Sequence, residues 1–139
     1  MARRSADLLA RVPLFAGLPK RHLRSVAGIS KEEGFDEKAT IATEGRPGDD
    51  FYVIISGQGR VVRRGRTVAS LMPGDFFGEI ALLDGGPRTA SIVAETPMRV
   101  MTLNRKPFHA VLEREPSIVL KMLEELAGRL RNVERPLTG

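Results

Sequence analysis

A carboxylate and a guanidinium stand near the two ends of one short segment, Phe77 to Ser91. Glu79 lies near its start, and Arg88 follows nine positions later. A guanidinium donates two parallel hydrogen bonds to the paired oxygens of a compact anion, and a carboxylate accepts a hydrogen bond from a hydroxyl. The segment is therefore a candidate binding site for a ligand that carries both a hydroxyl group and a small anion.

The residues between these two charges suit close contact with an anion. Gly78 permits a close approach of the backbone. Ile80, Ala81 and Leu82 are expected to begin a single helical turn whose first N–H groups point at the anion. Gly85, Gly86 and Pro87 let the loop close and stiffen the approach to Arg88, and the Thr89 hydroxyl and the Ala90 N–H complete the cradle.

Each of these residues has an ordinary structural explanation when it is taken alone. A single Glu or Arg in a loop is usually solvated, and Phe77-Gly78 is often a turn beside a core aromatic. The functional interpretation depends on the combination, Phe-Gly-Glu-x-Ala-Leu followed by Pro-Arg-Thr-Ala, which is far more specific than a glycine-rich pattern.

The elements that position this segment are predicted to be mainly short β-strands. Between Lys31 and Asn104, β-prone runs alternate with Gly, Pro and Asp, a pattern typical of a sandwich or jelly roll. Val61 to Val68 reads as one hairpin. The expected strands are Lys31–Phe35, Thr40–Thr43, Phe51–Ser56, Gly59–Arg64, Thr67–Met72, Ser91–Ala94 and Met98–Asn104.

Helices are expected on both sides of the strands. The first covers Ser5 to Arg11 and ends at Pro13, and a turn leads into the second, Pro19 to Ala27, which buries Leu18, Leu23 and Val26. A helix returns near Pro107 with Phe108, Val111 and Leu112 on its apolar face. Pro116 ends it, and a longer helix follows from Ser117, its expected cap, to Val133.

The long C-terminal helix carries an apolar stripe with spacings of three and four residues. This stripe packs on the same chain, covers a ligand or forms the seam of a homodimer, and the sequence leaves these alternatives open. Its members are Val119, Met122, Leu123, Leu126, Leu130 and Val133.

The composition restricts the class of protein. With 139 residues, of which 42% are hydrophobic, the chain is expected to form one domain. It has no cysteine and hence no disulfide or cysteine-based metal site, and it shows no signal peptide and no apolar run that would span a membrane. We expect a cytoplasmic protein. The net charge is +5, but the arginines are scattered, so we do not expect DNA as a partner.

Residues 77–91 resemble the phosphate-binding cassette of the cyclic-nucleotide-binding domain family, whose members include catabolite-activator-type regulators and protein kinase A regulatory subunits. The resemblance extends over almost the whole chain. Val12 to Pro19 is similar to the opening helical segment of the family, Glu44 to Ile54 to its Gly-Asp turn and following strand, and Pro73 to Glu79 to its approach to the cassette.

The resemblance implies an eight-stranded β-roll with flanking helices that binds cAMP or cGMP. Arg88 would pair with the cyclic phosphate and Glu79 with the ribose 2′-hydroxyl, and the helix between Met122 and Leu130 would cap the base. Thr89 bears on cGMP tolerance, although we favour cAMP. The expected site residues are Phe77, Gly78, Glu79, Ile80, Ala81, Arg88, Thr89, Ala90, Val61, Val68 and Leu71.

The expected organisation is a single domain over residues 1–139: N-terminal helices over 1–30, the β-roll over 31–104, C-terminal helices over 105–134 and a tail over 135–139. We expect a sensor without its own catalytic or DNA-binding domain, with an effector protein as its partner and a second copy of the chain as a further candidate partner. The alternative is an interaction scaffold or homodimerisation module that uses the C-terminal helix and whose roll binds nothing.

Catalysis is not expected. The two histidines, His22 and His109, lie far apart on predicted helices, where we expect both to face solvent. They cannot supply the several histidines of a cupin-type metal site, so no catalytic cofactor and no metal are expected.

Overall fold

The structure is a computed structural model that describes the backbone of residues 2–138 and the side chains of residues 4–132. The chain divides into two compact units. Residues 29–108 form a β unit, and residues 1–28 together with 109–139 form a helical unit. Each unit is described below by itself. The prediction that residues 1–139 act as one domain stays a prediction.

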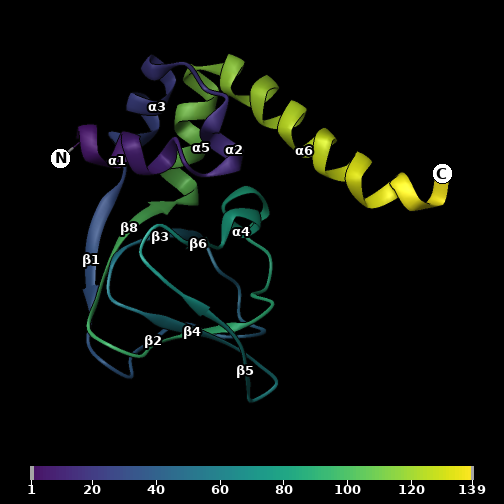
Figure 1. Cartoon of the computed structure of the whole chain (residues 1–139). Coiled ribbons are helices and arrows are strands. Elements are labelled where there is room, and N and C mark those ends of the chain that lie inside the picture. The colour runs from purple at the N-terminus through teal and green to yellow at the C-terminus, as the bar shows by residue number, and fades with distance from the viewer. Residues whose placement is uncertain (1, 139) are drawn as a thin grey trace. The chain divides into compact units, whose positions relative to one another are not determined.

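The β unit contains two four-stranded antiparallel sheets (Figure 1). One has the order β1-β8-β3-β6 and the other the order β2-β7-β4-β5. The predicted class, mainly β with eight strands and flanking helices, is confirmed. The bounds are β1 (Lys31–Phe35), β2 (Thr40–Ala42), β3 (Asp50–Ser56), β4 (Gly59–Arg63), β5 (Arg66–Leu71), β6 (Phe76–Phe77), β7 (Ser91–Ala94) and β8 (Met98–Asn104).

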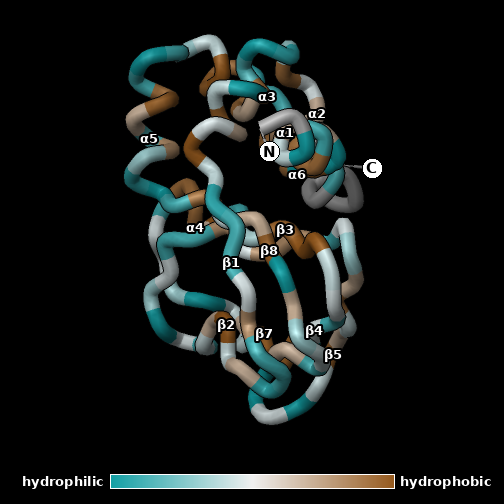
Figure 2. The backbone as a smooth tube through the Cα atoms, turned by 90° about the vertical axis from the view of Figure 1, so that its left-hand side faces the viewer, coloured by the Kyte–Doolittle hydropathy of each residue, from teal (hydrophilic) through white to brown (hydrophobic). Residues whose placement is uncertain are grey.

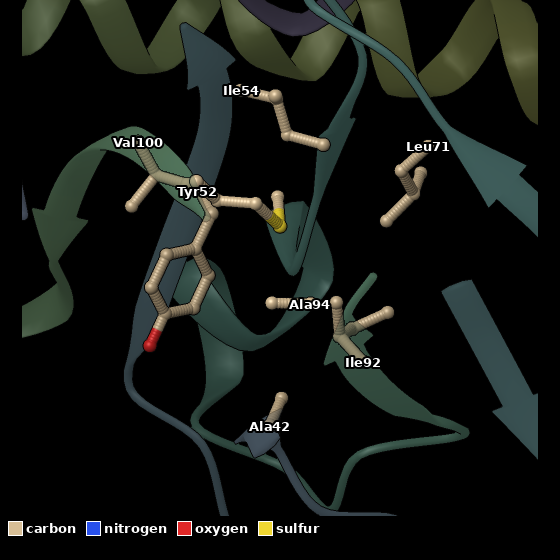
Figure 3. Close-up of a cluster of buried hydrophobic side chains, with 8 residues drawn as sticks. Ala42, Tyr52, Ile54, Leu71, Ile92, Ala94 and Val100 are labelled. Atoms are coloured by element: carbon tan, nitrogen blue, oxygen red, sulfur yellow. The ribbon is translucent and has the colours of Figure 1, made fainter. Parts of the chain in front are cut away.

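The two sheets share an apolar core. Tyr52, Ile54 and Val100 of the first sheet belong to the same buried cluster as Leu71 and Ile92 of the second (Figure 3). The strands β3 and β8 lie side by side in the middle of their sheet, and four consecutive residues are buried in each. Figure 2 shows β3 in hydrophobic colours, as expected for a strand that is covered on both faces.

The hairpin between β4 and β5 forms because its two central residues accept positive φ angles. Arg64 has φ 52° and Gly65 has φ 77°, the backbone of a two-residue turn that matches the twist of the strands. The pairing of the two strands shifts by one residue along their length. Val61 of β4 pairs with Ala69 of β5, but the next residue of β4, Val62, pairs with Thr67. Val68 is therefore the extra residue of a β-bulge, and this displaces its side chain from the regular alternation.

Two helices complete the polypeptide around the cassette. The six-residue helix α4 (Glu79–Asp84) follows β6 after one residue, Gly78, and corresponds to the predicted helical turn. Helix α5 (Arg105–Arg114) follows β8 without a gap and begins two residues before Pro107. Because its first turn needs no intrahelical donor at Pro107, the proline is tolerated inside the helix.

The helical unit contains α1 (Ala2–Leu9), α2 (Pro13–Ala16), α3 (Lys20–Ala27), the second part of α5 and α6 (Pro116–Thr138). Leu18, Leu23 and Val26 are buried as predicted. Residues 13–16, expected to be a turn, form a short helix instead, because Pro13 sits at the first helical position, where a missing N–H costs nothing.

Two predictions for this unit are wrong. His22 was expected on a solvated face, but its residue is 5% exposed and its ring is hydrogen-bonded. Ser117 was expected to cap α6, but α6 begins one residue earlier, at Pro116, and the Ser117 hydroxyl bonds the His22 ring. The predicted stripe on α6 is divided, since Met122 is buried whereas Leu123 and Leu130 are exposed. The side chain of Val133 lies outside the described residues.

Candidate ligand-binding pocket

Two glycines with positive φ angles mark the ends of α4. Gly78 precedes the helix with φ 87°, and Gly85 ends it with φ 66°, where its N–H donates to the Ala81 carbonyl at 2.7 Å. A Cβ atom on Gly78 would lie 2.5 Å from Arg88 Nη1 and 2.6 Å from the Asp50 carbonyl oxygen. Only glycine therefore fits at this position, for reasons of both backbone conformation and space.

The backbone of Arg88 is paired with the loop between β2 and β3. The Arg88 N–H donates to the Arg46 carbonyl at 2.8 Å, and the Gly45 N–H donates to the Arg88 carbonyl at 2.8 Å. An isolated antiparallel bridge joins Pro47 to Pro87 in the same stretch. This pairing fixes the position of the Arg88 backbone, from which its side chain extends.

The Arg88 guanidinium is oriented by three neighbours. Its Nη2 donates to the Asp50 carbonyl at 2.7 Å, and its Cζ lies 5.8 Å from the centroid of the Tyr52 ring, within the range of a cation–π interaction. A Cβ atom on Gly48 would overlap Nε and Cζ of this group, so the guanidinium lies directly against the Gly48 backbone.

Tyr52 forms part of the support behind the cassette. Its ring stacks on Phe77 with the centroids 4.6 Å apart and an interplanar angle of 20°. Its hydroxyl donates to Asp50 Oδ2 at 3.4 Å, and Asp50 Oδ1 accepts from the Asn104 amide at 2.9 Å. Burial, together with the nearby Asp50 charge, raises the pKa of Tyr52 to about 12.

Glu79 and Arg88 line the same pocket in the β unit, a cavity of about 430 Å³. An acceptor and a forked donor thus face one space, and apolar side chains from both sheets line the rest. Ten of the eleven predicted site residues line it: Val61, Leu71, Phe77, Gly78, Glu79, Ile80, Ala81, Arg88, Thr89 and Ala90.

Val68 is the predicted site residue that is not among the lining residues of this pocket. Val68 is 55% exposed, and it is the extra residue of the bulge in β5. Ile80 lines the pocket and is also 55% exposed, which places it at the rim.

Seven lining residues are absent from the list of expected site residues, although Gly86 and Pro87 were expected to shape the loop: Ala42, Arg63, Phe76, Asp84, Gly86, Pro87 and Ile92. One of them, Arg63, had a usable signal. Arg63 is two positions after Val61 on β4, so both belong to one face of the strand, and its Nε donates to the Thr89 carbonyl at 3.2 Å. Ala42 and Ile92 are register partners across β2 and β7, which no local pattern reveals.

The described residues support neither a metal site nor a membrane-spanning helix. Among them, no group of three or more His, Cys, Asp or Glu side chains is arranged to hold a metal ion. In that same part of the chain, no helix combines the length and apolar character that crossing a membrane requires.

Comparison with known proteins places this chain in a family. The family model described as "Cyclic nucleotide-binding domain" matches residues 32–115. A CRP-like cAMP-activated global transcriptional regulator of Mycobacterium tuberculosis is 33% identical over 136 residues, which cover 94% of this chain. The chain spans 61% of the length of that relative.

Solved structures show the same fold. The N-terminal domain of a transcriptional regulator from Streptomyces coelicolor A3(2) superposes with a TM-score of 0.86 at 31% identity, covering 94% of this chain and 95% of that one. The cAMP-bound structure of PfPKA-R superposes with a TM-score of 0.71 at 27% identity, covering 99% of this chain and 47% of that one.

Proposed function

The chain belongs to the cyclic nucleotide-binding domain family, and from this premise we propose that its pocket binds cAMP as a regulatory ligand. The observation that carries the proposal is the presence of Glu79 and Arg88 in one pocket with an apolar wall. The names of the relatives support a regulatory role, since one is a cAMP-activated regulator and one solved structure holds cAMP.

Each part of a cyclic nucleotide has a chemical counterpart among the lining residues. In the proposed complex, Arg88 donates to the exocyclic oxygens of the cyclic phosphate, and Glu79 accepts from the ribose 2′-hydroxyl. The flat base packs against the apolar wall of Val61, Leu71 and Ile92. The Thr89 hydroxyl and the Ala90 N–H are proposed to add hydrogen bonds to the phosphate.

The fixed position of Arg88 favours this assignment. A guanidinium held by the Asp50 carbonyl and the Gly48 and Gly78 backbones loses little conformational entropy when an anion binds. A forked donor also discriminates a phosphate from a single acceptor, because only the phosphate offers two oxygens at the matching spacing.

We propose binding without turnover. A carboxylate that accepts from a ribose hydroxyl and a guanidinium that pairs with a phosphate need no shifted pKa and no nucleophile.

The whole protein is proposed to pass the binding signal to an effector, and the C-terminal helices are the part that reorganises. The comparisons do not favour the alternative of an interaction scaffold whose roll binds nothing.

A second copy of this chain is a proposed partner. Leu120, Leu123 and Leu130 are each more than half exposed, and they follow one another on α6 at spacings of three and seven. These spacings place them along one side of the helix, as in the seam of a coiled coil. Homodimerisation through α6 would remove this apolar surface from water.

Thermal unfolding with three ligands tests the proposed function. A ligand that binds only the folded state stabilises it by RT ln(1 + L/Kd), where L is the free ligand concentration, and so raises the melting temperature. We expect the largest rise with cAMP, a smaller rise with cGMP, and none with 5′-AMP, whose open phosphate carries a second negative charge. Equal melting temperatures with and without cAMP at millimolar concentration would contradict the proposal.

A further inference from the structure

His22 uses both nitrogens of its buried ring to join segments that are distant in the sequence. Nδ1 lies 2.8 Å from Glu115 Oε1, and Nε2 lies 2.8 Å from Ser117 Oγ. The His22 side chain is 7% exposed and that of Glu115 is 25% exposed. A buried imidazole with two short hydrogen bonds is costly to release, because each nitrogen would then lose its partner.

The cluster tolerates either protonation state of the ring. A serine hydroxyl donates to a neutral Nε2 and accepts from a protonated one, while Nδ1–H donates to the carboxylate in both states. Hydrogen bonds from Ser25 and His22 hold the pKa of Glu115 below its usual value, so that Glu115 remains a negatively charged acceptor.

These contacts lie where α5 gives way to α6. The Glu115 N–H still donates to the Val111 carbonyl at 2.9 Å, whereas Pro116 already begins α6. A helix boundary at a proline is a place where the chain can bend, because the ring removes a donor from the hydrogen-bond ladder. His22 on α3 is therefore hydrogen-bonded to the residue before Pro116 and to the residue after it.

We propose that His22, Glu115 and Ser117 form a latch that makes α3 and the base of α6 move together. The inference depends on the proposed function, since it states how a ligand-driven change in the C-terminal helices would reach the N-terminal helices. When α6 changes its orientation at the latch, the hydrogen bonds to His22 make α3 move with it.

A chain of Ser, His and Glu in this order also occurs in hydrolases, where the serine faces a substrate. Here Ser117 lines neither the ligand pocket nor the smaller pocket beside Leu14 and Lys121. The three side chains are therefore positioning residues in our assignment.

A double-mutant cycle tests the latch without a ligand. His22→Ala, Glu115→Ala and the double variant are compared by urea unfolding. We expect non-additive effects, with the double variant more stable than the sum of the single changes implies by a factor of about ten in the unfolding equilibrium constant. Additive effects would overturn the latch. Ser117→Ala and Glu115→Gln are milder variants if His22→Ala does not fold, and Glu113→Gln on the exposed side of α5 is the matched control.

Hydrogen exchange of the whole chain with and without saturating cAMP tests the coupled motion. We expect the amides of α3 and of residues 117–120 to change protection together in the parent protein and in Glu113→Gln. In Glu115→Ala the change in α3 should be lost while cAMP still protects residues 78–90. A full response of α3 in Glu115→Ala would overturn the inference. Failure of cAMP to protect residues 78–90 in the parent would instead contradict the proposed function, and the cycle above would still decide the latch.

Discussion

Arg88 is held in place by its own chain through contacts that the cassette sequence alone does not reveal. The short segment from Phe77 to Ala90 could be predicted as a site because its residues are adjacent in the sequence. The support for Arg88 comes from residues about forty positions earlier: the Gly48 backbone, the Asp50 carbonyl and the Tyr52 ring. Contacts of this kind depend on strand pairing, which local patterns do not determine.

The first prediction at this scale concerns Gly78. A side chain at Gly78 strains the backbone and pushes against Arg88, so we expect Gly78→Ala to weaken cAMP binding by about tenfold or more. Gly74→Ala is the control, because Gly74 has a similar φ of 94° but open space around the added Cβ. Calorimetric titration of both variants separates backbone strain from the displacement of Arg88. Equal cAMP affinities of the two variants would contradict the account.

The second prediction concerns Tyr52, the only tyrosine in the chain. Its phenol should ionise at a pKa of about 12 instead of 10, and absorbance of the tyrosinate during an alkaline titration reads this directly. Because the folded-state pKa is raised, the stability that the neutral phenol contributes is present below pH 10 and is lost as the pH rises toward 12. Tyr52→Phe should remove this part of the alkaline destabilisation. A midpoint near 10 in the folded protein would show that Tyr52 is not buried against Phe77.

At the scale of elements, the turn residues of the sequence were sufficient to predict most strands of the β-roll. Gly and Pro between short apolar runs located seven strands, and the glycine after Ala27 located the end of α3. The two-residue strand β6 was missed because it is too short to show alternation. The bulge in β5, which contains Val68, was missed because it depends on the partner strand.

The helices show where tertiary contacts override local signals. Ser117 has the residue type of a helix cap, but its hydroxyl bonds His22, whose position is 95 residues earlier. No periodicity in the sequence connects these two positions. The amphipathic stripe of α6 was identified, but the division between the buried Met122 and the exposed Leu123 required the structure.

The prediction for α6 concerns self-association. Replacing Leu123 and Leu130 by lysine puts charges into the proposed seam, and we expect the double variant to be monomeric at concentrations where the parent is dimeric. Light scattering coupled to gel filtration measures this. Lys121→Glu, on the same helix and half exposed, changes the charge without touching the leucines and should leave the dimer intact. A parent protein that stays monomeric at all concentrations would contradict the proposed homodimer.

At the scale of the whole molecule, the proposed ligand pocket lies in the β unit, and the exposed apolar surface and the proposed latch lie in the helical unit. The family could be identified from the cassette and three further segments, and the comparisons confirm it. The identity of the effector depends on surfaces of other proteins and did not follow from this chain.

The most direct test of the central claim is isothermal titration calorimetry of cAMP with the parent protein, Arg88→Ala and Arg60→Ala. Arg60 on β4 carries the same charge, its side chain is 41% exposed and it pairs with Glu95, so its replacement controls for the loss of one cation. We predict saturable cAMP binding to the parent and to Arg60→Ala, and a loss of about 2–5 kcal/mol in binding free energy for Arg88→Ala. Equal affinity of Arg88→Ala and the parent, or no binding of cAMP to the parent, would contradict the account.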